Sequence, residues 1–98
     1  MNIQDVTQQI SDRVSKEEQS LGATLKFVIP DHGVVYLDGN SDAVSNDDND
    51  ADCVVTVAME DLEAMLGGSL NPAMAFMGGK LQVEGDMSVA MKLQNVVG

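Results

Sequence analysis

The sequence is poor in aromatic residues, cysteine and basic residues, and each shortage excludes a class of protein. Only Phe27, Tyr36 and Phe76 are aromatic, so the core must be mainly aliphatic. A single cysteine, Cys53, excludes an internal disulfide framework. Five basic residues against 16 acidic ones give a net charge of −11. A surface of this kind repels phosphate backbones, which excludes nucleic-acid binding.

Membrane anchoring and export are also disfavoured. Binding to anionic membranes needs clustered basic residues, so we expect at most transient membrane contact. The longest apolar stretches are too short to span a bilayer. The first residues lack the charged and apolar regions of a secretory signal. The last residues, Val-Val-Gly98, match no recognised targeting or lipidation signal. These features favour a cytoplasmic protein made of one domain, residues 1–98.

The first half of the chain predicts one helix followed by strands. Apolar residues recur at helical spacing over residues 3–20, with polar side chains on the other face. Alternating apolar residues then predict strands at 24–29 and 34–38, joined by a turn at 30–33. A short third strand is expected over residues 42–45.

The second half mixes strands and helices. Residues 53–58 are rich in β-branched residues and nearly continuously apolar, which is typical of a strand covered on one or both faces. Helices are predicted over 60–66, 72–77 and 87–96, with a strand at 80–84. Strands mixed with flanking helices indicate an α+β fold, a sheet with helices on one face.

Methionine carries an unusual share of the apolar content. Six of the seven methionines lie between Met59 and Met91. Because methionine is unbranched and polarizable, it fills irregular space and adapts to variable partners. The residues alone leave two interpretations open, an ordinary core filled by methionine and a surface that adapts to a ligand.

An aspartate-rich segment runs from Asp38 to Asp52. It invites a calcium-binding interpretation, but no register starting at an aspartate has the glycine and the glutamate that an EF-hand loop requires. We therefore interpret the segment as solvated turns around an edge strand.

Other reactive or glycine-rich features do not form a catalytic motif. His32 lies in a turn without a Cys/His cluster, and Cys53 has no basic or helix N-terminal setting, so we expect a turn residue and a buried inert thiol. The glycine pairs 67–68 and 78–79 lack the spacing of a phosphate-binding loop. We expect them to end helices and to act as hinges for the segment 72–77.

The second half of the chain resembles the sterol carrier protein type 2 family. The resemblance covers about 45 residues, and the expected order of elements agrees over the whole chain. The residues that carry it are Ala51-Asp52-Cys53 with Thr56, Asn71-Pro72, Ala75-Phe76, Gly79-Lys80-Leu81, Gly85 and Ala90-Met91-Lys92-Leu93-Gln94.

The resemblance implies a five-stranded mixed sheet covered on one face by helices, with an apolar tunnel between the layers. It also implies a non-enzymatic carrier of fatty acids, sterols or other apolar lipids that needs no metal or redox cofactor. The sequence offers no nucleophile–base pair that would support an enzymatic function. The alternative from another class is a protein-interaction or partner-subunit module with a filled core.

The ligand-facing elements provide the candidate lipid-binding residues. Gln94 would place a polar amide on the same stripe as Met87 and Met91, where it can hold a hydroxyl or carbonyl group of a ligand. The alternative is a structural role, in which the Gln94 amide forms hydrogen bonds with the backbone or with water. The full candidate set is Phe27, Val35, Val57, Leu66, Met74, Phe76, Met77, Leu81, Met87, Met91 and Gln94.

The charge balance favours some lipids over others. An acidic surface disfavours anionic head groups such as coenzyme A. Lys26, Lys80 and Lys92 are the only basic residues expected near the ligand-facing elements. Neutral lipids or fatty acids should therefore bind better than acyl-CoA.

Overall fold

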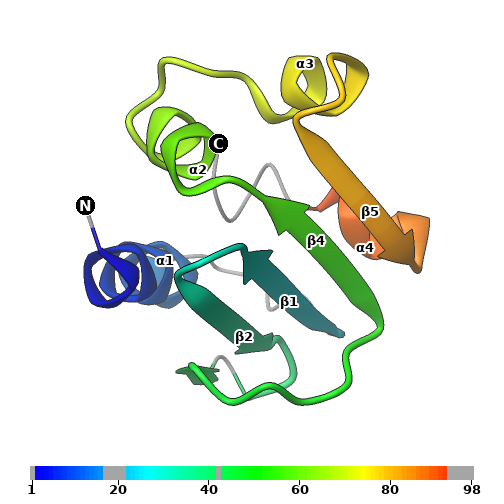
Figure 1. The fold of residues 1–98 in the computed structure, drawn as a ribbon. Coiled ribbons are helices and arrows are strands. Elements are labelled where there is room, and N and C mark those ends of the chain that lie inside the picture. Colours follow the sequence, from blue (N-terminus) through cyan, green and yellow to red (C-terminus); the bar gives the residue numbers. More distant parts are fainter. Residues whose placement is uncertain (1, 17–21, 42, 93–98) are drawn as a thin grey trace.

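The structure is a computed structural model that describes residues 2–16, 22–41 and 43–92. Figure 1 shows a twisted sheet with helices packed beside it and beyond its last strand. The elements are α1 (Ile3–Lys16), β1 (Thr24–Ile29), β2 (Gly33–Asp38), β3 (Ala43–Ser45), β4 (Cys53–Val57), α2 (Met59–Leu66), α3 (Pro72–Met77), β5 (Leu81–Gly85) and α4 (Met87–Met91).

The five strands form one mixed sheet in the order β3-β2-β1-β4-β5. Neighbouring strands are antiparallel except β1 and β4, which run parallel. After the edge strand β3, the chain crosses β2 and β1, and β4 joins the sheet on the other side of β1. The expected α+β fold with a five-stranded mixed sheet is confirmed, and β5 forms one outer edge of the sheet.

The core lies on one face of the sheet. Phe27 on the central strand is paired with Val35 on one side and with Val55 on the other, and all three are fully buried. Strand alternation sends Leu81 of β5 to the same face, since it pairs with Val57. Helix α1 closes this face with Val6, Ile10 and Val14, and α2 adds Met59, Leu62, Met65 and Leu66.

A charged contact joins the two covering helices. The Arg13 guanidinium of α1 donates a hydrogen bond to the backbone carbonyl of Leu66, the last residue of α2. A cation at this position also complements the negative end of the helix dipole. The contact fixes how α1 and α2 lie over the core.

A hydrogen-bonded junction holds the start of the two parallel strands. The backbone N–H of Thr24 donates to Asp52 Oδ2 at 3.1 Å, and the Asp52 N–H donates to Thr24 Oγ1 at 2.8 Å. The Asp86 N–H donates to the Asp52 carbonyl at 2.8 Å, which places the start of α4 against β4. The end of β5 and the start of α4 are therefore tied to the centre of the sheet.

Most predicted element boundaries agree with the structure to within one residue. The clear error is the last helix, expected over 87–96, because Lys92 already lies in a turn. The Lys92 N–H bonds to the Val89 carbonyl at 3.0 Å, a tight i→i+3 closure that ends α4 at Met91. Residues 17–20 of the first predicted helix and 93–96 of the last lie outside the described residues.

Within the aspartate-rich segment, residues 39–41 form a turn, β3 forms an edge strand as expected, and residues 46–51 have no regular secondary structure. Asp48 pairs with Lys26 at 2.8 Å on the sheet face opposite to Phe27, and Asp38 accepts a hydrogen bond from the Asn40 N–H. Among the described residues no group of three or more His, Cys, Asp or Glu side chains is arranged to hold a metal ion. In the same ranges no helix has the length and apolar character needed to cross a membrane.

Candidate functional site

Helix α3 is a short helix with well-defined ends. Asn71 accepts a hydrogen bond from the Ala73 N–H at 2.8 Å and caps the start, and Pro72 occupies the first turn. At the other end the Lys80 N–H bonds to the Ala75 carbonyl at 2.8 Å. Ala75 is fully buried and anchors the helix to the core. Pro72 is buried as well, whereas the four other side chains of α3 are exposed.

Helix α4 is held in a similar way beyond β5. The Asp86 carboxylate accepts hydrogen bonds from the Ser88 N–H at 2.9 Å and from the Ser88 hydroxyl at 2.6 Å. These bonds hold the pKa of Asp86 below its usual value. Val89 is buried against the core, so it sets which side of α4 faces inward.

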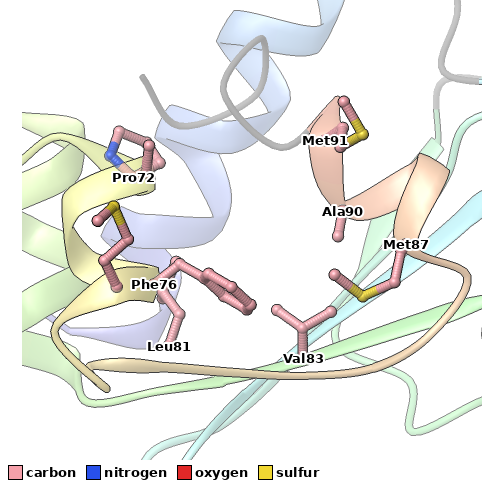
Figure 2. A pocket seen from close by; sticks show the side chains of 9 residues that line it. Pro72, Phe76, Leu81, Val83, Met87, Ala90 and Met91 are labelled. Carbon is pink, nitrogen blue, oxygen red and sulfur yellow. The ribbon is translucent and has the colours of Figure 1, made fainter.

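An apolar pocket lies between these two helices, above β5. Figure 2 shows Pro72, Phe76 and Leu81 on one side of a gap, with Val83, Met87, Ala90 and Met91 on the other. The pocket has a volume of about 360 Å³, within the usual size range of small-molecule sites. Its described lining consists of Pro72, Ala73, Phe76, Met77, Leu81, Val83, Met87, Ala90 and Met91.

The pocket is open to solvent on its rim and closed by the core at its floor. Met77 is 84% exposed and Met91 is 82% exposed, whereas Leu81 is 3% exposed. Phe76 and Met87 lie between these extremes, with about half of each side chain exposed. Side chains at the mouth can therefore change rotamer without disturbing the packed floor.

The lining contains no ionisable or hydrogen-bonding side chain among the described residues. Lys80, which precedes Leu81 in the chain, forms an ion pair with Asp61 at an N–O distance of 3.8 Å. Neither of these two residues lines the pocket. Such walls favour apolar groups removed from water and offer nothing for acid–base or nucleophilic chemistry.

The structure separates the candidate residues into groups. Phe76, Met77, Leu81, Met87 and Met91 lie together around the pocket. Met74 is 68% exposed on α3 and is not part of the lining. Gln94 lies outside the described residues. The remaining candidates are buried in the core and do not line this pocket: Phe27, Val35, Val57 and Leu66.

Four lining residues were not among the candidates: Pro72, Ala73, Val83 and Ala90. Two of them had a usable signal. Val83 follows Leu81 at strand spacing and so shares its face, and Ala90 lies on the same helical stripe as Met87. Ala73 and Pro72 carry no signal of this kind, because they line the pocket only through the way α3 sits beside β5.

The remaining reactive side chains lie away from this pocket. Cys53 is a fully buried free thiol, and its burial raises the pKa, with the Asp86 carboxylate adding to the effect. His32 is exposed in the turn between β1 and β2. It borders a shallow hollow together with Glu60 and Glu63 of α2. The buried thiol fits the expected inert cysteine.

Comparison with known proteins gives consistent matches over almost the whole chain. Bovine (Bos taurus) sterol carrier protein 2 is 32% identical over 100 residues, covering 94% of this chain and 18% of that protein. The crystal structure of sterol carrier protein 2-like 2 from Aedes aegypti has a TM-score of 0.83 at 23% identity, covering 97% of this chain and 95% of that one. A solution structure of palmitated sterol carrier protein 2-like 2 from the same mosquito has a TM-score of 0.79 at 25% identity, covering 99% and 95%.

The matched bovine protein is much longer than this chain, which spans less than a fifth of its length. The likeness therefore concerns one domain of that protein. The sequence model of the SCP-2 sterol transfer family matches residues 3–98. The chain belongs to the SCP-2 sterol transfer family.

Proposed function

We propose that this domain is a lipid carrier that holds the hydrocarbon part of a fatty acid or similar apolar lipid in the pocket between α3, β5 and α4. The observation that carries the proposal is a pocket of about 360 Å³ whose described lining is entirely apolar. The palmitated mosquito relative supports a fatty acid as the ligand class. The same pocket argues against the alternative of an interaction module with a filled core.

The binding energy comes from removing hydrocarbon from water. Each methylene group transferred into an apolar site contributes about 0.8 kcal/mol, or about a fourfold change in affinity. The flexible Met77, Met87 and Met91 side chains can follow ligands of different shape. Broad tolerance of branching and shape follows from such a lining.

The described lining residues carry no charge, and this selects among lipid head groups. A fatty acid or a neutral lipid can leave its polar end at the open mouth, where water remains available. Acyl-CoA would bring several negative charges to a protein with a net charge of −11. We therefore propose that acyl-CoA binds more weakly than the free fatty acid of the same chain.

We further propose that the domain itself performs no reaction on its ligand. The described part of the lining supplies no nucleophile, acid or base, and the Cys53 thiol lies in the core with a raised pKa. The much longer relatives carry other segments, whose activities do not transfer to this domain.

The first test measures binding and its dependence on chain length. Native mass spectrometry of the purified protein should detect a co-purifying lipid near one-to-one occupancy. Delipidated protein titrated with saturated fatty acids of increasing length should gain about fourfold in affinity per added methylene until the pocket is full. An affinity that does not change with chain length, or no binding at micromolar protein, would contradict the proposal.

We also propose a cytoplasmic location, supported by the lone cysteine, which is a buried free thiol and suits a reducing compartment. Fluorescence microscopy of the natural full-length protein carrying an internal tag would test this. Signal confined to an organelle would contradict it.

A further inference from the structure

The negative charge of the chain is unevenly distributed. Residues 1–71 contain 14 acidic and three basic residues, so this part carries the whole net charge of −11. Residues 72–98 contain Glu84 and Asp86 against Lys80 and Lys92, so their net charge is zero. The segment that builds the pocket is thus electrically neutral within a strongly acidic molecule.

Among the described residues, the large apolar side chains that are exposed to solvent all lie in this segment. They are Met74, Phe76, Met77, Met87 and Met91, between 46% and 84% exposed. We call this set the methionine patch. Exposed apolar side chains gathered in one region indicate an interaction surface, whereas scattered ones are ordinary.

The methionine patch is continuous with the mouth of the pocket. Four of its five residues line the pocket, as Figure 2 shows for Phe76, Met87 and Met91. The fifth, Met74, lies one helical turn from Met77, so the two are neighbours on α3. Whatever covers the patch also covers the route by which an apolar ligand reaches the pocket.

We propose that the methionine patch docks on an electrically neutral lipid surface, such as a bilayer of zwitterionic phospholipids. This inference rests on the proposed lipid-carrier function and adds the place and charge type of the donor or acceptor surface. A neutral patch of flexible thioether side chains can enter the boundary between head groups and acyl chains without burying a charge. An anionic bilayer would repel the acidic remainder of the molecule.

The charged residues around the patch agree with this choice. Lys80 forms an ion pair with Asp61 of α2, and Asp86 is engaged in capping α4. No basic cluster faces outward among the described residues, so contact with the surface depends on apolar insertion. Docking should therefore respond to membrane charge in the opposite sense from that of a basic peripheral protein.

Vesicle flotation tests the charge dependence. The full chain is mixed with vesicles of phosphatidylcholine alone or of phosphatidylcholine with phosphatidylglycerol, at low and high salt. We expect flotation with the neutral vesicles and a several-fold smaller bound fraction with the anionic ones at low salt. High salt should remove this difference, because screening shortens the reach of the charges to about 3 Å at 1 M.

A pair of charge-matched variants tests the position of the contact. Met74→Glu and Gln4→Glu each add one negative charge at an exposed position, the first in the patch and the second on α1. We expect Met74→Glu to lower partition to neutral vesicles about tenfold, since it removes an apolar side chain from the contact. Gln4→Glu should leave partition close to that of the unchanged protein.

Fatty-acid affinity is measured for each variant in vesicle-free solution, so that a docking defect is separated from a damaged pocket. The inference is overturned by equal losses in the two variants, by stronger flotation with anionic vesicles, or by no flotation of a protein that still binds palmitate. A Met74→Glu-sensitive dimer without vesicle binding would overturn it in favour of a second copy. Failure to bind any fatty acid in solution would instead overturn the proposed function.

Discussion

Two phenylalanines in this chain have opposite surroundings. Phe27 is fully buried on the central strand β1, with Val35 and Val55 beside it, whereas Phe76 on α3 is 46% exposed at the pocket. The first belongs to a region closed by α1 and α2. The second belongs to the α3–β5–α4 region, where short helices leave apolar side chains uncovered.

The difference follows from position in the sheet. Strand β1 has neighbours on both sides, and α1 and α2, with 14 and eight residues, cover its inward face, so each inward side chain is packed. Strand β5 lies at the sheet edge, and the helices beside it have only six and five residues. Helix α3 buries Pro72 and Ala75, helix α4 buries Val89, and both expose their longer side chains. One region therefore provides stability, and the other provides open apolar surface.

Replacing each phenylalanine by alanine should separate these roles. Phe27→Ala removes a fully buried ring and leaves a cavity, which should cost about 3–5 kcal/mol of unfolding free energy. Phe76→Ala removes a half-exposed ring, so we expect a loss of about 1 kcal/mol in stability and about tenfold in fatty-acid affinity. Urea unfolding and fatty-acid titration of both variants measure the two effects.

Similar losses of unfolding free energy in the two variants would contradict this expectation. That result would mean that Phe76 is packed as tightly as Phe27 in solution. Titration of Phe27→Ala should be done well below its melting temperature, so that unfolding is not mistaken for loss of the pocket.

Two glycines with positive φ, one just before β5 and one at its end, make a second matched pair. A Cβ on Gly85, where φ is 102°, would lie 2.3 Å from the Asp52 carbonyl oxygen, which is far inside contact distance. Gly79 has φ of 76° but nothing within 4 Å of its Cβ position. Gly85→Ala should cost more than about 3 kcal/mol, from clash and backbone strain together, and Gly79→Ala about 1–2 kcal/mol, from strain alone. Thermal unfolding of both variants checks the order.

The sheet was predictable from sequence because its signals are local and repeated. Residues 24–29 alternate apolar and polar side chains, and Phe27 and Ile29 are buried as that alternation requires. Asn71-Pro72 likewise specified where α3 begins, through the cap and the fixed φ of proline.

The pocket was only partly predictable, because burial depends on contacts far apart in sequence. Spacing placed Val57 and Leu66 on apolar faces, but it did not reveal that α1 and the rest of α2 cover the core so completely. Met77 and Met87 carry the same apolar character and remain exposed. Only the shortness of α3 and α4 and the edge position of β5 distinguish them, and the length of α4 was overestimated from its pattern.

The Asn71 cap allows a test of whether the pocket depends on α3 being ordered. Asn71→Ala removes the acceptor of the Ala73 N–H and should cost about 1 kcal/mol, whereas Asn71→Asp keeps an acceptor and should cost less. Because α3 contributes much of the pocket wall, fatty-acid affinity should fall in the alanine variant. Hydrogen exchange at Ala75 and Phe76 should become faster in that variant. Equal exchange in both variants would show that packing of Ala75 alone holds the helix.

The smallest expected effect is a pH dependence at the start of α4, carried by Asp86. Hydrogen bonds from Ser88 are the main cause of its lowered pKa, with the Val89 N–H and the charge of Lys92 contributing less. Because the folded state favours the carboxylate, this stabilisation is complete above the ordinary aspartate pKa of about 3.9 and is lost as pH falls through the lower folded-state value.

Acid should therefore loosen α4, with Met87 and Met91, before it affects the buried strands around Phe27. NMR signals of Ser88 and Val89 followed from neutral pH downward should shift in this window, while signals of Phe27 stay constant. Asp86→Asn supplies a matched control, since asparagine also caps helices well but does not titrate. In that variant the shift at Ser88 should disappear. A shift that persists would assign the transition to another acidic group. Asp86 would then not be the reason that α4 loosens before the strands around Phe27.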